Sequence, residues 1–412
     1  MTRPLVSIVV VSRGRPRDLR RCVLGLSQLF YHPFEVVIVA DPAGRAAITD
    51  WSDRIKFVPF DQANISAARN AGLDAAAGQI IAFIDDDAVP EPSWLDHLIA
   101  PFADKTVDAA GGWVRGRNGI SFQNKSRTVD GDGTHLQVNH LGSEPLVLRG
   151  TANAAPRTEG TNMAWRRQVL ADLGGFNAAY RFFADETDLN MRLALRHGVT
   201  ALVPLAQVHH GYGASAMRSA DRVPLNLYEV GASWAVYVTR YAADTTRALA
   251  VARGGERSRM IHHAVRGNVW PGAVRKRLAE FDAGVAAGMQ RPDAFWAAPP
   301  PPPFRPWSDA APTRASVAIV SGLRHRRAAQ DLARRHRVDG ARVSLWRFSP
   351  TALYHHIRFD DAGVWLQTGG VFGRSDRQMP IFTPTRLQSR AASEVAKVSA
   401  LREIAETHFI GA

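Results

Sequence analysis

Apolar and polar residues follow a strand–helix rhythm over the first part of the chain. Residues 5–12 and 35–40 are continuous apolar runs rich in valine and isoleucine, a pattern typical of strands that are buried on both faces. Between them, residues 17–29 carry leucines near three- and four-residue spacing, which predicts a helix. The rhythm continues with a short strand at 54–58.

An alanine-rich helix at 64–77 then precedes a strand at 79–84 that ends in three aspartates. Strands that alternate with helices indicate an α/β fold, with a mostly parallel sheet flanked by helices. Such sheets bind ligands beyond the carboxyl ends of their strands. The side chains that follow these strands are therefore the first candidates for a functional site.

The rhythm is lost over residues 113–160, where glycines and scattered polar residues predict an insertion or a long mobile loop. Helices are predicted over 163–173 and 186–197, and an extended segment over 199–208. An amphipathic helix is predicted over 225–250.

Five consecutive prolines at 299–303 predict a stiff spacer, since proline fits neither a helix interior nor a central strand. Beyond them, strands at 316–321 and 342–347 enclose an arginine-rich helix. Residues 353–359 and 363–367 resemble a hairpin. We therefore expect a first domain over 1–240, a helical extension over 241–298, the proline linker, and a small α/β region over 304–412.

Charge separates the two halves of the chain. The 412 residues carry a net charge of +13, but residues 1–240 hold 25 basic and 24 acidic side chains, whereas residues 241–412 hold 26 basic and 14 acidic ones. This basic C-terminal part predicts either an ordinary solvated arginine-rich face or a surface for polyanions such as anionic lipid. No nucleic-acid-binding motif accompanies the charge, so no nucleic acid is expected.

The sequence also bears on compartment. Cys22 is the only cysteine, which excludes an intramolecular disulfide and fits a reducing compartment. Arginines at 13, 15 and 17 argue against a cleaved signal peptide, and no apolar run reaches the roughly 18 residues that span a bilayer. We expect a cytoplasmic protein, attached at most peripherally to the inner face of the membrane.

Asp85, Asp86 and Asp87 follow the strand at 79–84 directly. Like charges this close raise one another's pKa values, and a divalent cation offsets them. Carboxylates at a strand end therefore indicate either a Mg²⁺ or Mn²⁺ site that leaves positions open for phosphates, or a solvated acidic turn.

The segments around these aspartates favour the metal site. Residues 64–72 read NISAARNAG, and the strand and aspartates follow; further on come GTNMAWRR at 160–167, LGGF at 173–176 and DETDLNMRL at 185–193. In this order they resemble family 2 glycosyltransferases, which have the GT-A fold, over about residues 4–240. The resemblance implies a metal-dependent, inverting transfer of a sugar from a nucleotide-sugar donor to a glycan or lipid-linked acceptor. Chains of this family that build long polymers carry a Gln-x-x-Arg-Trp motif, which is missing here, so we expect one sugar per encounter.

The resemblance also implies roles for individual residues. Asp185 and Glu186 form the catalytic acidic pair, with Glu186 as the general base, and Asp87 and His209 are metal ligands. Asn162, Trp165 and Asp188 fall on the acceptor side, although Trp165 is as readily a core residue. The donor side comprises the residues that the family places around the nucleotide and its phosphates, namely Ser12, Arg15, Asp41, Arg69, Asn70, Asp85 and Asp86. Asp41 stands in for the acidic turn that the family has after its second strand.

Other functions fit less well. A dinucleotide-dependent oxidoreductase needs Gly-x-Gly-x-x-Gly after the first strand, and residues 13–18 read RGRPRD instead. A P-loop is also missing. Two alternatives stay open: a metal-dependent nucleotide-sugar hydrolase, and a polyanion- or membrane-binding module with a degenerate transferase domain.

Overall fold

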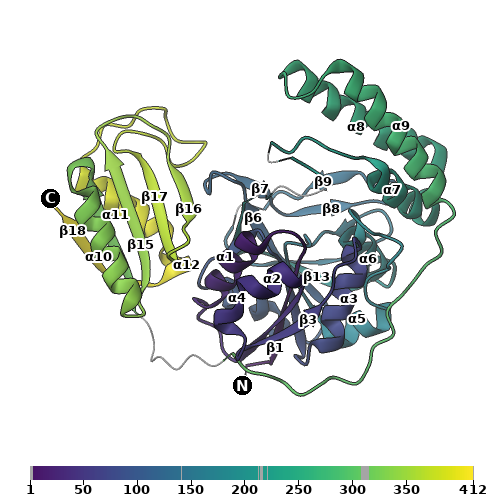
Figure 1. The fold of residues 1–412 in the computed structure, drawn as a ribbon, viewed down its shortest axis with the longest axis horizontal. Helices are drawn as coiled ribbons and strands as arrows, with labels where there is room; N and C mark the ends of the chain where they lie inside the picture. The colour runs from purple at the N-terminus through teal and green to yellow at the C-terminus, as the bar shows by residue number, and fades with distance from the viewer. Residues whose placement is uncertain are drawn as a thin grey trace.

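A computed structural model describes residues 3–140, 142–211, 213, 217–219, 221–307 and 315–411. Three sheets organise them, a large one in the N-terminal part, a small one beside it and a third in the C-terminal part (Figure 1).

Four parallel strands form one half of the large sheet, in the order β4-β1-β2-β3. They are β1 (Val6–Ser12), β2 (Phe34–Ala40), β3 (Ile55–Pro59) and β4 (Ile80–Asp85), and the helices around them are α1 (Pro16–Leu26), α2 (Pro42–Ala47), η1 (Thr49–Trp51) and α3 (Ile65–Ala75). Ile8 and Val10 pack with α1, whereas Val9 packs with α3 on the opposite face. Burial on both faces explains the continuous apolar runs, and the predicted α/β fold is confirmed.

Beyond β4 the sheet is mixed, because β12 enters antiparallel between β4 and β6, and β13 runs parallel to β6. The strands are β5 (Ala88–Pro90), β6 (Ala109–Arg115), β7 (Phe122–Asn124), β10 (Leu146–Arg149), β12 (Asn162–Arg166) and β13 (Val199–His210). The helix predicted over 163–173 is therefore wrong in its first part, since α5 (Arg167–Leu173) begins only after β12. Met163 and Trp165 face one core and Ala164 the other, which is strand alternation.

Residues 113–160 contain short strands rather than one long loop. A small sheet in the order β11-β8-β9 is formed by β8 (Arg127–Val129), β9 (His135–Gln137) and β11 (Ala155–Pro156). Strands of only two or three residues leave almost no periodic signal, which explains why the sequence pattern does not predict them. The remaining helices of this part are α4 (Trp94–Ile99), η2 (Ala100–Ala103) and α6 (Asp185–Leu195).

Three helices follow as the extension: α7 (Tyr228–Tyr241), α8 (Thr245–Val265) and α9 (Pro271–Gly288). The single helix predicted over 225–250 is interrupted, because Asp244 caps α8 by accepting a hydrogen bond from Arg247 N. α8 and α9 form a hairpin that projects from the body of the molecule (Figure 1). Within the described residues, no helix has the length and apolarity needed to cross a bilayer.

The chain around the proline run is anchored to the N-terminal part. Trp296 is buried beside α3 and donates its Nε1 hydrogen to Asp74, and Trp307 stacks on Phe34 with 5.8 Å between ring centroids. Because both tryptophans are buried, the prolines at 299–303 run along the first domain instead of standing away from it.

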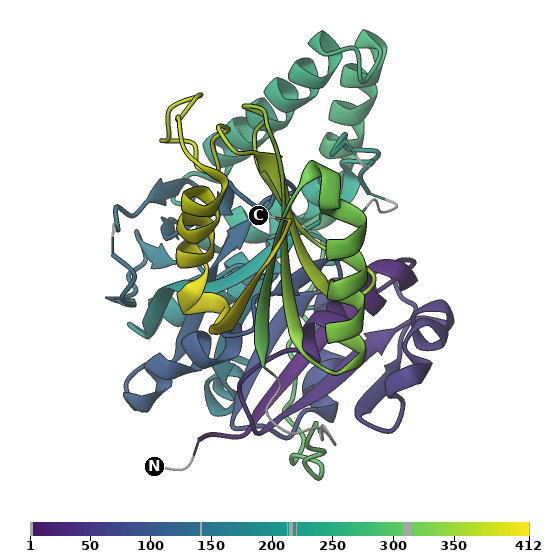
Figure 2. The same cartoon turned by 90° about the vertical axis from the view of Figure 1, so that its left-hand side faces the viewer.

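The C-terminal region is a second α/β unit with the sheet order β16-β17-β15-β14-β18, in which β16 alone is antiparallel to its neighbour. Its elements are β14 (Ser316–Gly322), η3 (Leu323–His325), α10 (Arg326–Val338), β15 (Arg342–Ser349), β16 (His356–Phe359), β17 (Val364–Gly370), α11 (Leu387–Lys397), α12 (Ser399–Arg402) and β18 (Ile404–Ile410). The predicted hairpin is confirmed as β16 and β17. Figure 2 shows this unit in front of the N-terminal part.

A buried ion pair joins the two units. Arg402 of α12 donates to both carboxylate oxygens of Glu91, at 2.7 and 2.8 Å, and both side chains are almost fully buried. Burial alone raises the pKa of Glu91, but Arg402 and His209 outweigh it and the pKa is lowered. His209 of β13 also pairs with Glu91, so that Glu91, Arg402 and His209 form one cluster. The ring of Trp365 in β17 lies 4.7 Å from the His209 ring and 4.3 Å from the Arg402 guanidinium. The C-terminal unit is therefore packed against the strand β13 of the first domain.

We expect Arg402→Ala to lower the free energy of unfolding by about 3–5 kcal/mol, because it leaves Glu91 buried without its cation. Chemical denaturation followed by tryptophan fluorescence measures the change. Arg327→Ala, which removes an exposed arginine from α10, is the control and should change the same quantity by less than about 0.5 kcal/mol. Equal stability of the two variants would contradict a structural role for this pair.

Candidate functional site

The acidic turn lies where β4 ends, next to the end of β1, as the parallel register of these strands requires. Its three carboxylates have different environments. Asp86 is fully buried. It accepts a hydrogen bond from Ser12 Oγ at 2.6 Å and forms an ion pair with Arg15 at 2.6 Å. Burial raises the pKa of Asp86 to about 8, against the opposing charge of Arg15. Asp86 thus supports the turn from within, which corrects the prediction that it contacts a nucleotide.

Asp87 faces the other strand of the site, β13. Its Oδ1 atom lies 3.1 Å from His210 Nε2, and its Oδ2 atom accepts hydrogen bonds from Arg15 at 2.9 Å and from the backbone N–H of Gly213 at 2.7 Å. Burial raises the pKa of this carboxyl, but His210, Arg15 and Arg218 together lower it well below its ordinary value. Asp87 is therefore ionised at neutral pH.

Asp85, Asp87 and His210 each offer one ligand atom, and these atoms lie within 4.8 Å of one another. Asp87 Oδ1 is buried and faces His210 Nε2, the other buried ligand atom, at 3.1 Å. Two carboxylates and an imidazole suit a divalent cation, and three protein ligands leave coordination positions for phosphate oxygens. The donor set therefore fits the predicted metal.

His209, the predicted ligand, lies on the other face of β13. Neighbouring residues of a strand point in opposite directions, and His209 Nε2 is 2.8 Å from Glu91 Oε1 in the cluster with Arg402. Burial lowers the pKa of His209, so the imidazole is neutral there. The prediction for His209 is corrected in favour of His210, whose Nδ1 is 3.0 Å from Gln123 Oε1 and whose orientation is thereby fixed.

Asp41 holds the loop that follows β1. One of its oxygens accepts from Gly14 N at 2.6 Å, and the other caps α2 through Gly44 N at 2.7 Å. Gly14 adopts the left-handed conformation (φ +68°), which favours glycine. Asp41 therefore shapes the loop that carries Arg15 into the site, whereas its own oxygens are engaged with the backbone.

Arg69 connects the acidic turn to the second acidic motif. It is buried, forms a short ion pair with Asp185, and lies 3.4 Å from Asp85. A Cβ atom at Gly160 would lie 2.4 Å from Arg69 Nη2, so the glycine that opens the 160–167 motif makes room for this guanidinium. Asn70 is different: both ends of its amide bond the backbone of Phe176, which corrects its predicted donor contact to a structural one.

Asp185 and Glu186 begin α6, where acidic side chains are favoured by the helix dipole. Phe183 and Ala184 precede them with φ of +74° and +64°, a strained backbone for residues other than glycine. Burial raises the pKa of Asp185 to about 7, partly offset by Arg69. For Glu186, Arg157 and Arg69 outweigh burial and lower the pKa to about 2. Glu186 is the more exposed of the pair and receives a hydrogen bond from Arg157 at 2.8 Å.

The three residues predicted on the acceptor side are all buried and engaged elsewhere. Asn162 bonds Trp94 Nε1 and two backbone carbonyls between strands, and Trp165 is a core residue with no exposed surface. Asp188 is bonded within α6 and α7 by Arg192, Tyr241 and other neighbours. These assignments are corrected: the three side chains pack inside the domain and are not exposed to an acceptor in this structure.

Sequence reasoning missed Arg157, Arg218, Gln123 and His210. The first three fall in segments without regular periodicity. His210 differs from His209 only by the face of the strand on which it lies, and the one-residue register that decides the face is set by pairing with β5 and β6. The double histidine was the one available signal.

The N-terminal part of the chain is similar in sequence to one known protein family. Residues 7–188 match the family model described as glycosyl transferase family 2. The O-antigen biosynthesis protein RfbC of Myxococcus xanthus is 30% identical over 244 residues, which are 54% of this chain but 18% of that protein. The glycosyltransferase AglE of Haloferax volcanii is 25% identical over 258 residues, which are 57% of this chain and 80% of that one.

Among solved structures, the mannosyltransferase PcManGT from Pyrobaculum calidifontis, in complex with GDP-Man and Mn²⁺, is similar at 15% identity with a TM-score of 0.44. The match covers 70% of this chain and 88% of that one. The S. aureus TarS structure is similar at 15% identity with a TM-score of 0.41, over 63% of this chain and 43% of that one.

Proposed function

We propose that the protein moves a sugar from a nucleotide-sugar donor to an acceptor hydroxyl with the help of Mn²⁺ or Mg²⁺, on the premise that residues 7–188 match the model of glycosyl transferase family 2. The observation that carries the proposal is the cluster of Asp85, Asp87 and His210 at the strand ends, joined through Arg69 to the acidic pair at the start of α6.

The donor diphosphate would lie against this cluster, with the metal held by Asp85, Asp87 and His210. When bound, the cation supplies Lewis-acid stabilisation of the departing nucleoside diphosphate. The imidazole ligand favours Mn²⁺, because Mg²⁺ takes oxygen ligands almost throughout. Arg15, which is one-fifth exposed, lies beside Asp87 and is placed to pair with a phosphate oxygen.

Glu186 is the proposed general base. Its carboxylate is ionised because its pKa is lowered, and its side chain is 13% exposed, against 3% for Asp185, which is paired with Arg69. Arg157 holds the Glu186 carboxylate in one orientation through a hydrogen bond of 2.8 Å. A base on the face of the sugar opposite the leaving group removes the acceptor proton as the new bond forms, which would invert the anomeric configuration.

A turnover assay tests the proposal against the hydrolase alternative. Release of nucleoside diphosphate from nucleotide sugars is measured with Mn²⁺, with EDTA, and with a panel of glycan and lipid-linked acceptors. We expect release that requires the metal and rises at least tenfold with one acceptor, with the sugar found on that acceptor. If nucleoside diphosphate is released at the same rate with and without every acceptor, and free sugar is the sole product, the protein is a hydrolase instead.

The acceptor that we propose is a glycan carried at an anionic membrane surface, which the protein would meet from the cytoplasmic side. Names of relatives point to glycan assembly, among them the O-antigen protein and the succinoglycan biosynthesis protein ExoM of Rhizobium meliloti. The α8–α9 hairpin offers the contact surface. Val265 and Trp270 at its turn are 82% and 85% exposed, and residues 257–279 contain six arginines and lysines and no acidic residue. Tryptophan and basic side chains together are typical of protein surfaces that lie at the lipid interface.

Co-sedimentation with vesicles tests this surface. We expect the protein to bind vesicles in which about a third of the lipid is phosphatidylserine, because their surface is anionic. We expect no binding to vesicles of neutral lipid. Trp270→Ala should weaken binding several-fold, because it removes the largest apolar group of the hairpin turn. Val251→Ala, which trims an exposed valine elsewhere on α8, is the matched control. If binding is the same for anionic and neutral vesicles and is unchanged in Trp270→Ala, the hairpin is not the membrane-contact surface.

A further inference from the structure

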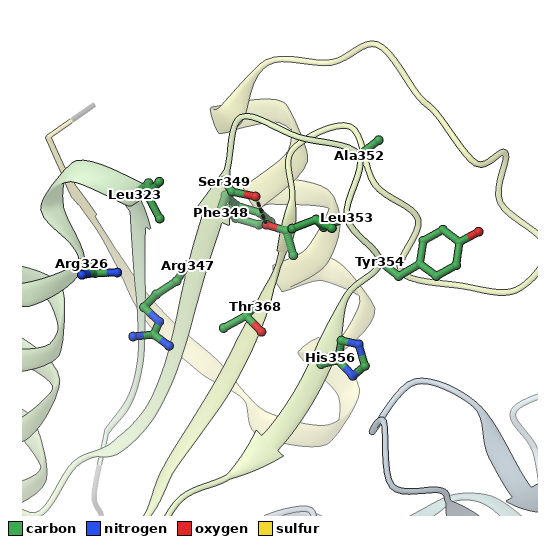
Figure 3. A pocket seen from close by; sticks show the side chains of 11 residues that line it. Leu323, Arg326, Arg347, Phe348, Ser349, Ala352, Leu353, Tyr354, His356 and Thr368 are labelled. Atoms are coloured by element: carbon green, nitrogen blue, oxygen red, sulfur yellow. Dashed lines mark hydrogen bonds between the residues drawn. The ribbon is translucent and has the colours of Figure 1, made fainter. Parts of the chain in front are cut away.

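A cavity of about 620 Å³ lies in the C-terminal unit, away from the metal cluster. Leu323 follows β14, Ser349 ends β15, and Thr368 and Gly369 lie near the end of β17. All three strands are parallel, so the cavity is at the carboxyl edge of the sheet (Figure 3). That edge is where open α/β sheets bind their ligands, and the volume is within the usual range of small-molecule sites.

The cavity is positively charged. Arg326, at the start of α10, and Arg347, near the end of β15, line one side of it (Figure 3). Neither side chain has an ion pair or hydrogen bond to any described residue, and neither does the nearby Arg358. Burial lowers the pKa of Arg347, and the charges of Arg358 and Arg326 lower it further. Asp360 acts in the opposite direction, but its Oδ1 atom is engaged by the backbone N–H groups of Ala362 and Val364.

The backbone adds to this charge. α10 is a helix of 13 residues that begins at Arg326 and has no side-chain cap, so the positive end of its dipole lies beside this arginine. A helix N-terminus of this kind stabilises an anion. Two arginines that form no ion pair with the described residues and the positive end of the α10 dipole thus lie on one side of the same cavity.

The other side of the cavity is suited to an organic group. Phe348 and Leu353 provide apolar surface, and Thr368 provides a polar group between Leu353 and the arginines (Figure 3). The ring of Tyr354 points away from the arginines and stacks with the guanidinium of Arg374 at 4.3 Å. Leu353 and Tyr354 are 64% and 47% exposed, which is a large apolar area for side chains at a concave surface.

We propose that this cavity is a second ligand site, which binds an organic phosphate of about the size of a nucleotide. Arg326, Arg347 and the positive end of the α10 dipole hold the phosphate, and Leu353 and Phe348 contact the organic part. The site requires no metal, because its positive charge comes from the protein itself. It goes beyond the transfer reaction proposed above and uses none of the residues of that site.

Isothermal titration of the full chain in EDTA tests the proposal, since EDTA removes the metal that the N-terminal site would need. The probes are uridine diphosphate, glucose 1-phosphate, inorganic phosphate and glucose. The two organic phosphates distinguish a nucleotide ligand from a sugar phosphate. We expect at least one of them to bind in EDTA more tightly than inorganic phosphate, and glucose not to bind.

Arg347→Ala and Arg326→Ala should each weaken that binding about tenfold or more, since each removes a charge-assisted contact to phosphate. Arg335→Ala removes the same charge from an exposed position on the last turns of α10 and should leave the affinity within twofold. Arg326 is exposed and outside the core, so its variant remains informative even if Arg347→Ala disturbs β15. The proposal is overturned if no phosphate compound binds in EDTA, if both arginine variants bind as the wild type does, or if glucose or inorganic phosphate binds as tightly as the organic phosphates. Metal-dependent transfer would be unaffected by any of these outcomes.

Discussion

The Asp87→Ala variant is expected to lose about a thousandfold in transfer rate. A cation that stabilises a leaving diphosphate contributes several kcal/mol to catalysis, and about 4 kcal/mol corresponds to a factor of a thousand. Asp87 and His210 are the two buried ligands of the proposed set, and removal of Asp87 leaves Asp85 and His210 as two ligands on separate elements. Initial rates at saturating Mn²⁺, together with a Mn²⁺ titration, measure the loss.

The two adjacent histidines provide a matched control for this prediction. His210→Ala should raise the Mn²⁺ concentration needed for half-maximal rate by at least tenfold, because it removes a ligand. His209→Ala should leave that concentration unchanged but lower the thermal midpoint, because His209 packs with Glu91 and Trp365. The reverse pattern would show that His209 is the ligand and that the assignment to the faces of β13 is incorrect.

The Glu186→Gln variant is expected to lose a factor of about 10² to 10⁴ in transfer rate, the usual contribution of a general base. Glutamine preserves the shape of the side chain and can still accept from Arg157, but it cannot take a proton at neutral pH. Donor affinity, measured separately by titration with Mn²⁺, should change by less than about threefold, since Glu186 does not belong to the metal set.

Glu159→Gln is the control for Glu186, because Glu159 also pairs with Arg157, at 3.5 Å. It removes a carboxylate from the same arginine without touching the proposed base, and it should keep most of the rate. If Glu186→Gln were active and Asp185→Asn were not, the base would be Asp185. The raised pKa of Asp185 would then match its function.

Apolar periodicity predicts some strands of this fold and not others. Strands buried on both faces, such as β1 and β2, are fixed by their own composition. β12 was misread because alternation of Met163 and Trp165 over five residues is too short to distinguish from a helix. The strands within 113–160 depend on pairing with one another and carry no local signal.

The candidate site shows the same division. The motif of three aspartates predicts a metal, and Asp85 and Asp87 do lie with a histidine. Strand register and distant partners decide the orientation of Asp86 and the choice between the two histidines. Asp86 is bonded by Ser12, which is 74 residues away in the chain, and His210 is bonded to Gln123, which is 87 residues away. The Glu91–Arg402 pair spans 311 residues and has no signature in the sequence.

A thermal-shift screen of nucleotide sugars with Mn²⁺ tests the central claim most directly. At a ligand concentration of about 100 times Kd, binding should stabilise the protein by roughly 2.7 kcal/mol. We predict that at least one nucleotide sugar raises the thermal midpoint of the wild type only when Mn²⁺ is present, and that Asp87→Ala shows no such rise. If no nucleotide sugar stabilises the wild type, or if the rise persists in EDTA and in Asp87→Ala, the account of a metal-dependent donor site is contradicted.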